Sequence, residues 1–82
     1  MSHYDEELNV LGLRCPLPLL EAKKKLARMA AGEVLKVMAD DPSSVIDFKS
    51  YATVANIDLI QCEKIENIFY FYIQKTAGEN AE

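Results

Sequence analysis

The residue with the clearest capacity for chemistry is Cys15, which stands in the run Gly12-Leu13-Arg14-Cys15-Pro16-Leu17-Pro18. Proline is favoured in the first turn of a helix, so this run predicts that a helix starts here. Backbone N–H groups at a helix start lack partners and the helix dipole is positive there, so an anion such as a thiolate is stabilised. Because Arg14 and Lys23 would add positive charge, we expect the pKa of Cys15 to lie below that of a free thiol.

A single reactive thiol limits the chemistry that is open to Cys15. The other cysteine, Cys62, lies 47 positions further on, a separation that fits no zinc spacing. It falls within an expected strand and has no basic residue directly beside it, which indicates a structural or incidental role. His3 is the only histidine and belongs to the N-terminal head, so no internal histidine is available as a base, which weakens an acyl-transfer mechanism. We expect no metal or other cofactor. A thiolate can still attack a sulfane sulfur directly, as it attacks a disulfide, and carry that sulfur to another protein.

These residues leave more than one function open. In a sulfur carrier, Cys15 would be the nucleophile, with Arg14 and Lys23 supplying positive charge. In a non-catalytic interaction or regulatory module, Cys15 would merely cap a helix, and slow alkylation at neutral pH with a raised pKa would favour that alternative. A monothiol redox domain of the thioredoxin type is disfavoured, because Pro42 starts a helix instead of facing the thiol from a loop.

Length, composition and charge narrow the class of protein. The chain has 82 residues, which fits one small domain that we expect to be monomeric, and its net charge of −4 argues against direct nucleic-acid binding. No stretch approaches the roughly 20 apolar residues of a membrane span, and the acidic head lacks a signal-peptide pattern, so we expect a cytoplasmic protein. Five of the nine Lys and Arg residues fall within residues 14–28, which predicts a positive field near Cys15.

The spacing of apolar residues predicts six elements between a flexible head, 1–7, and a flexible tail, 76–82. Glycine and proline mark several boundaries: Gly32 suits a helix C-cap, and Asp40-Asp41-Pro42 suits a helix start. A tight turn at Glu66-Asn67 predicts an antiparallel hairpin. In chain order, the expected elements are a strand at 8–11, a helix starting within 15–18 and ending near 31, a strand at 33–39, a helix from 42 to 56, and strands at 57–65 and 68–75.

The order β-α-β-α-β-β indicates one α/β domain at residues 8–75, of the α+β two-layer sandwich type. Right-handed crossovers would place both helices on one face of a mixed four-stranded sheet. The opposite face, which carries Tyr70 and Tyr72, would be exposed unless a partner covers it.

The run from Leu11 to Pro18, followed by Lys23 and Lys24, resembles the TusA (SirA-like) family of sulfur carriers. The resemblance extends over residues 8–75 and implies a sandwich like the C-terminal domain of translation initiation factor three. It includes a second group of motif residues, for which we expect a structural role: Gly12, Asp40, Asp41, Pro42 and Asp47.

The resemblance implies a sulfurtransferase in which Cys15 accepts a persulfide sulfur from a cysteine desulfurase or a rhodanese. A downstream sulfur relay protein would then receive the sulfur, in many members towards 2-thiouridine in tRNA, and in others towards sulfur oxidation, molybdenum cofactor or selenium pathways. Lys23 matches a basic residue that helps dock partners. The other residues expected to support Cys15 or to form the docking surface are Arg14, Pro16, Leu17, Pro18, Lys24 and Arg28.

Two positions depart from the family pattern. Asn9 stands where the family usually has aspartate, which bears on the contact beneath the glycine loop. Ala52 stands where some members carry a second cysteine, so a two-thiol mechanism is excluded at that place.

Overall fold

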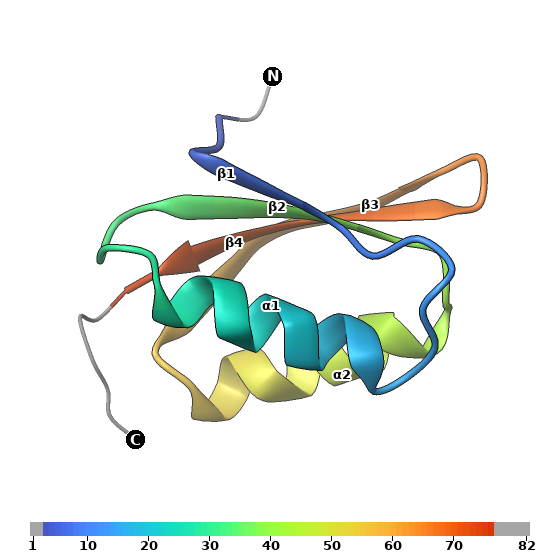
Figure 1. Cartoon of the computed structure of the whole chain (residues 1–82), viewed down its shortest axis with the longest axis horizontal. Coiled ribbons are helices and arrows are strands. Elements are labelled where there is room, and N and C mark those ends of the chain that lie inside the picture. The colour runs from blue at the N-terminus through green and yellow to red at the C-terminus, as the bar shows by residue number, and fades with distance from the viewer. Residues whose placement is uncertain (1–2, 77–82) are drawn as a thin grey trace.

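Two helices cover one face of a four-stranded sheet in the computed structural model, which describes residues 3–76 (Figure 1). The order β-α-β-α-β-β and the two-layer arrangement agree with the predicted fold class. In chain order, the elements are β1 (Glu6–Asn9), α1 (Leu17–Ala27), β2 (Val34–Ala39), α2 (Ser43–Val54), β3 (Ile57–Ile65) and β4 (Ile68–Lys75).

The sheet is mixed, with the strand order β1-β2-β4-β3. β1 and β2 are parallel, while β4 runs antiparallel to both of its neighbours, β2 and β3. The predicted hairpin joins β3 to β4 through Glu66 and Asn67, which have φ values of 49° and 70°. Two positive φ values in a two-residue loop give a turn whose twist matches that of the flanking strands.

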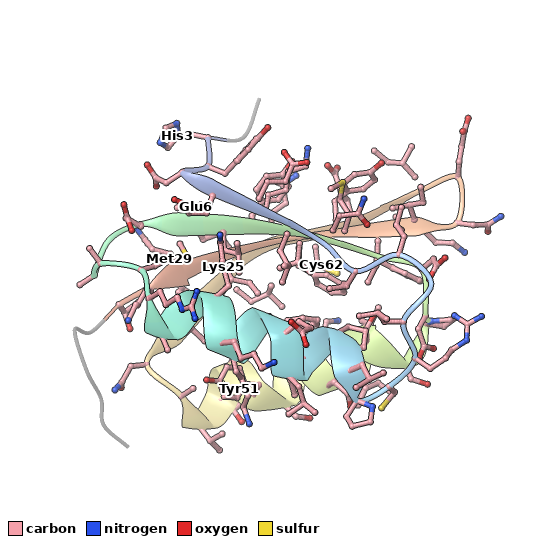
Figure 2. The ribbon with its side chains drawn as sticks, in the orientation of Figure 1. His3, Glu6, Lys25, Met29, Tyr51 and Cys62 are labelled. Carbon is pink, nitrogen blue, oxygen red and sulfur yellow. The ribbon has the colours of Figure 1, made fainter. Side chains whose placement is uncertain are left out.

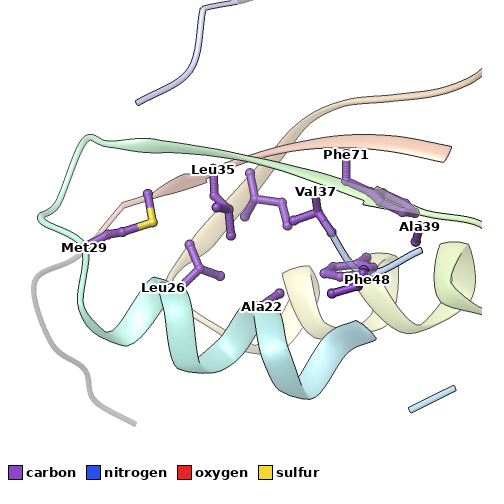
Figure 3. Close-up of a cluster of buried hydrophobic side chains, with 10 residues drawn as sticks. Ala22, Leu26, Met29, Leu35, Val37, Ala39, Phe48 and Phe71 are labelled. Carbon is purple, nitrogen blue, oxygen red and sulfur yellow. The ribbon is translucent and has the colours of Figure 1, made fainter. Parts of the chain in front are cut away.

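The core lies between the sheet and the two helices (Figure 3). The ring of Phe48 in α2 stacks on the ring of Phe71 in β4, with 4.6 Å between centroids, and both side chains are fully buried. Ala22 and Leu26 of α1 close the core from the other helix. Their spacing of four residues places them on one helix face, as the apolar pattern requires.

The first strand begins and ends earlier than predicted, at Glu6 and Asn9. Asp5 extends this pairing, because its N–H donates to the carbonyl of Val34 and its carboxylate accepts the Val34 N–H, at 2.8 and 2.9 Å. Part of the expected head therefore pairs with β2. Residues 1–2 of the head and 77–82 of the tail lie outside the described residues.

Helix α1 ends at Ala27, four residues before the predicted end. The carbonyls of Leu26 and Met29 accept hydrogen bonds from the Lys75 ammonium, at 2.7 and 2.8 Å. Gly32 has the expected positive φ of 94°, but its N–H donates to the Lys75 carbonyl and not to a helix carbonyl. One helical carbonyl and one in the turn after the helix are thus paired with a side chain from β4, which the local sequence does not reveal.

The outer face of the sheet is partly covered by the chain itself. Tyr72 is only 8% exposed, and the ring of Tyr4 lies against it with 6.3 Å between centroids. The Lys36 ammonium lies 5.0 Å from the Tyr4 ring centre and 5.4 Å from that of Tyr70. The expectation that Tyr72 is exposed was therefore wrong, because the residues before β1 fold over it.

Candidate functional site

Cys15 lies on an exposed loop between β1 and α1, two residues before the helix begins. Pro16 is the N-cap of α1 and Pro18 lies in its first turn, as the proline pattern predicts. The N–H of Leu17 donates to the Arg14 carbonyl at 2.8 Å, which closes a turn around Cys15. The thiol is therefore held next to a helix start and is reachable from solvent.

Asp40, at the end of β2, supports the glycine loop. Its Oδ1 accepts the N–H of Gly12 at 3.0 Å and lies 3.6 Å from the Arg14 guanidinium. Gly12 has a φ of 87°, a conformation that side chains disfavour, so glycine suits this turn. Arg14 is therefore paired with a carboxylate and does not stand as an isolated positive charge beside the thiol.

Asp41 joins the thiol loop to the start of α2. Its Oδ2 accepts the backbone N–H of Cys15 at 2.6 Å, and its Oδ1 accepts the N–H of Ser43 at 3.1 Å. These two backbone N–H groups, chiefly that of Cys15, hold the pKa of Asp41 below its usual range, and Arg14 adds to the effect. A single carboxylate thus connects two segments that are distant in the sequence.

The lowered pKa of Asp41 predicts a loss of stability in acid. A carboxylate whose pKa is lower in the folded state stabilises the fold above its unfolded pKa, about 4, and this contribution disappears as the pH falls through the folded value. We expect the urea concentration at the unfolding midpoint to decrease as the pH falls below about 4. Asp41→Asn should weaken this dependence on pH. The exposed carboxylate variant Asp58→Asn should keep the wild-type profile, and an Asp41→Asn profile that matches the wild type would contradict the assignment.

Asp47, in the second turn of α2, contacts the thiol itself. The Sγ–H of Cys15 donates to Asp47 Oδ2 at 2.7 Å. This hydrogen bond raises the pKa of Cys15, and desolvation and the negative charges of Asp47 and Asp41 act in the same direction. The expectation of a lowered pKa in a positive field was therefore wrong, because carboxylates from the second crossover surround the thiol.

The predicted basic residues of α1 do not gather at Cys15. Lys23 lies over the ring of Tyr51 in α2, 5.0 Å from its centre, and Lys24 pairs with Glu21 at 3.4 Å. Arg28 is the C-cap, about 16 Å along the helix axis from Leu17 at 1.5 Å per residue. Figure 2 shows Lys25 reaching from α1 towards the sheet, where its ammonium lies 3.3 Å from a Glu6 carboxylate oxygen.

The far half of α1 also borders a shallow hollow with a volume of about 270 Å³. Its lining residues come from β1 and α1: Leu8, Glu21, Lys24, Lys25 and Arg28. Lys24, Lys25 and Arg28 therefore form a basic region along α1, distinct from the carboxylates that contact the Cys15 loop.

The apolar residues near Cys15 divide into a surface group and a buried one. Leu17 is 45% exposed and Leu20 is 43% exposed, so α1 presents two apolar side chains to solvent in its first turn. Pro18, in contrast, is fully buried. Pro18 was expected to support Cys15 or to form the docking surface, and its burial fits a supporting place inside the domain and not an exposed surface.

The sequence profile described as Sulfurtransferase TusA matches residues 6–75 of this chain. The chain belongs to the TusA family. It is 43% identical over 76 residues to the sulfur carrier protein TusA of Allochromatium vinosum, a match that covers 93% of this chain and all of that protein. It is also 39% identical to a putative sulfur carrier protein of Neisseria meningitidis, over 84% of this chain and 93% of that protein.

A solved structure supports the same assignment to the TusA family. The crystal structure of a SirA-like protein from Desulfitobacterium hafniense superposes with a TM-score of 0.69 at 26% identity, covering 89% of this chain and all of that one. The resemblance and the fold predicted from sequence are therefore confirmed. Membership of the TusA family supports a general role in carrying sulfur between relay partners.

Asn9, the first departure from the TusA pattern, still accepts a hydrogen bond beneath the glycine loop. Asn9 Oδ1 accepts the N–H of Leu11 at 2.9 Å, a hydrogen bond that an aspartate oxygen could equally accept. Ala52, the second departure, lies half-buried in α2. The loop geometry of this TusA-family chain therefore does not depend on an aspartate at position 9.

Cys62 lies on β3, the strand at one edge of the sheet (Figure 2). It pairs with Phe71, and partial burial raises the pKa of its thiol, which Lys49 partly opposes. Both cysteines are free thiols. Within residues 3–76 no group of three potential metal ligands comes together, and no helix is long and apolar enough to cross a membrane.

Proposed function

We propose that Cys15 is the residue on which this TusA-family protein carries sulfur, as a persulfide. The observation that carries the proposal is the exposed thiol at the tip of the Cys15-Pro16-Leu17-Pro18 loop, held there by two carboxylates of the second crossover. The donor would be a cysteine desulfurase or a rhodanese, and the acceptor a downstream relay protein, for example one serving tRNA 2-thiouridine synthesis in the cytoplasm.

The reaction needs no cofactor and conserves atoms and electrons. The Sγ of Cys15 attacks the outer sulfur of the donor's cysteine persulfide, so a new S–S bond forms and the donor's S–S bond breaks. Cys15 becomes a persulfide while the donor cysteine is reduced to a thiol. An acceptor thiolate then attacks the outer sulfur of the Cys15 persulfide, so the new S–S bond forms on the acceptor while the S–S bond to Cys15 breaks and Cys15 leaves as a thiolate that takes up a proton. In this way the protein would act as a sulfurtransferase between two partners.

The donor would dock over the first turn of α1. Leu17 and Leu20 provide an exposed apolar surface next to the thiol, of the kind that is buried at the centre of protein interfaces. The predicted basic residues Lys24 and Arg28 continue this surface along the helix. Lys23, whose ammonium lies over the ring of Tyr51, would contact the donor from the side of α1 that faces α2.

A charge at position 17 should separate docking from chemistry. We expect Leu17→Asp to lower the rate of sulfur transfer from a desulfurase about tenfold, because a carboxylate would be buried in the apolar contact. Transfer from a small-molecule persulfide should stay close to wild type. Val54→Asp is the matched control, since Val54 is 82% exposed at the far end of α2. Equal losses with both donors would argue against a docking role for Leu17.

Mass spectrometry after incubation with a cysteine desulfurase and cysteine tests the proposal. The protein should gain the mass of one sulfur atom, which a reductant removes, and peptide mapping should place it on Cys15. A label found only on Cys62 would contradict the assignment of the site.

The raised pKa of Cys15 favours one alternative, a non-catalytic interaction or regulatory module in which this cysteine is structural. In that case the thiol would stay protonated and inert towards a persulfide donor. The same labelling experiment distinguishes the two functions, because a module gains no sulfur while its fold and its partner binding persist.

A further inference from the structure

The contact between Cys15 and Asp47 differs from the other carboxylate contacts of this loop. Asp40 and Asp41 accept backbone N–H groups, and both therefore shape the loop. Asp47 reaches the reacting atom itself, with its Oδ2 at 2.7 Å from Sγ. This geometry is that of a hydrogen-bonded pair between a nucleophile and a proton acceptor.

The position of Asp47 is set by the rigid part of the fold. Its neighbour in α2, Phe48, is fully buried against Phe71, so this turn of the helix is anchored in the core. The carboxylate is half-buried and points from α2 to the loop that precedes α1. A group fixed in this way is held in position before the reaction, which is what proton transfer at a reacting atom requires.

We propose that Asp47 is a catalytic residue of sulfur transfer, which receives the thiol proton of Cys15 as Sγ attacks the donor sulfur. This inference rests on the proposed function and adds to it a residue for which the sequence predicted only a structural role.

The step is balanced within the pair and the donor. As the bond between Sγ and the outer donor sulfur forms, the Sγ–H bond breaks and its proton passes to Asp47 Oδ2. The donor's S–S bond breaks at the same time and its cysteine leaves as a thiolate. The proton on Asp47 then passes to that thiolate, so the carboxylate is restored and no other oxidant or reductant is consumed.

The charges around Cys15 explain why a proton acceptor is useful. From the loop after β2 come Asp40, paired with Arg14, and Asp41, and from α2 comes Asp47. Asp47, chiefly through its hydrogen bond, and the charge of Asp41 favour the protonated thiol, so they raise the pKa of Cys15 and leave little free thiolate at neutral pH. A thiol that shares its proton with a carboxylate can attack without first becoming a free thiolate. General base catalysis of this kind typically increases the reaction rate about 10²–10⁴-fold.

The pH dependence of sulfur acceptance in Asp47→Asn tests the inference. Glutathione persulfide serves as the donor in single-turnover measurements, so that protein docking does not enter, and Cys62→Ser is the common background. At about pH 6 we expect Asp47→Asn to accept sulfur at least tenfold more slowly. The deficit should shrink towards about pH 9 as direct thiolate attack takes over. Asp47→Glu, which keeps a carboxylate, should recover part of the rate at low pH.

Thiolate absorbance near 240 nm provides a readout that a merely structural role would not produce. Asp47→Asn should lower the pKa of Cys15 while it slows transfer, so the variant has more thiolate and yet reacts more slowly at low pH. Thermal denaturation should show that both variants fold, with Asp58→Asn as the surface control. An unchanged rate at about pH 6, or a deficit that is equal at every pH, would overturn the inference. If the background protein itself accepts no sulfur, the proposed function fails, whereas normal acceptance with no effect of Asp47→Asn removes only the role of Asp47.

Discussion

A protein that carries Cys15→Ser is expected to accept no sulfur from any persulfide donor, while Cys62→Ser accepts it at the wild-type rate. Serine keeps the backbone N–H that donates to Asp41, so the loop should retain its shape. Its hydroxyl is a poor nucleophile towards sulfane sulfur and cannot form a persulfide. Mass spectrometry of each variant after incubation with a desulfurase and cysteine measures the difference.

The two serine variants control for each other. Both cysteines are exposed and free, so a donor that modified thiols at random would label either of them. Labelling of Cys15→Ser to the wild-type level would end the proposal that Cys15 is the carrier. Loss of labelling in Cys62→Ser, with its fold intact, would show that the second thiol takes part.

Phe48→Ala is expected to destabilise the domain by about 3–5 kcal/mol, the range for removal of a buried aromatic ring. The ring is fully buried and stacks on Phe71, so both the apolar contact and the aromatic pair are lost. The total free energy of unfolding of a native protein is about 5–15 kcal/mol, so this substitution would remove a large share of the stability. Urea denaturation followed by circular dichroism gives the free energy of unfolding.

Val54→Ala provides the comparison on the same helix. Val54 is 82% exposed, and surface substitutions of this kind usually change stability by less than about 0.5 kcal/mol. Because Asp47 adjoins Phe48, Phe48→Ala should also weaken the contact between α2 and the thiol. Similar stabilities for the Phe48→Ala and Val54→Ala variants would contradict the packing described for this core.

A carrier whose thiol is held protonated differs from the usual picture of a reactive cysteine. A low pKa makes a thiol reactive towards every oxidant as well as towards its proper donor. The carboxylates around Cys15 raise the pKa of this thiol, so less free thiolate is present between transfers. If Asp47 accepts the proton during transfer, the thiol becomes a nucleophile only when a donor persulfide lies against Sγ.

Local spacing was sufficient to predict most of the fold. The prolines at positions 16 and 18 indicated where α1 begins, and Glu66 and Asn67 indicated the hairpin. The position of Cys15, exposed beside the helix start, also followed from these local signals. Each depends on backbone preferences of neighbouring residues, which a sequence displays directly.

The electrostatics of the site depended on the tertiary structure. From the sequence, the basic residues near Cys15 predicted a positive field, but Lys23 lies over the Tyr51 ring, Arg28 lies at the far end of α1, and Arg14 pairs with Asp40. Asp41 and Asp47, which follow 26 and 32 residues later, beyond α1 and β2, contact Cys15 directly.

The early start of β1, the capping of α1 by Lys75 and the cover of Tyr4 over Tyr72 also join distant parts of the chain. The sequence by itself indicated the order of the elements, the family and an exposed cysteine beside a helix start, because these follow from short-range backbone preferences and motif spacing. Only the folded chain decided which charges surround the thiol, because electrostatic energy depends on distances through space, and those are set where the two crossovers meet.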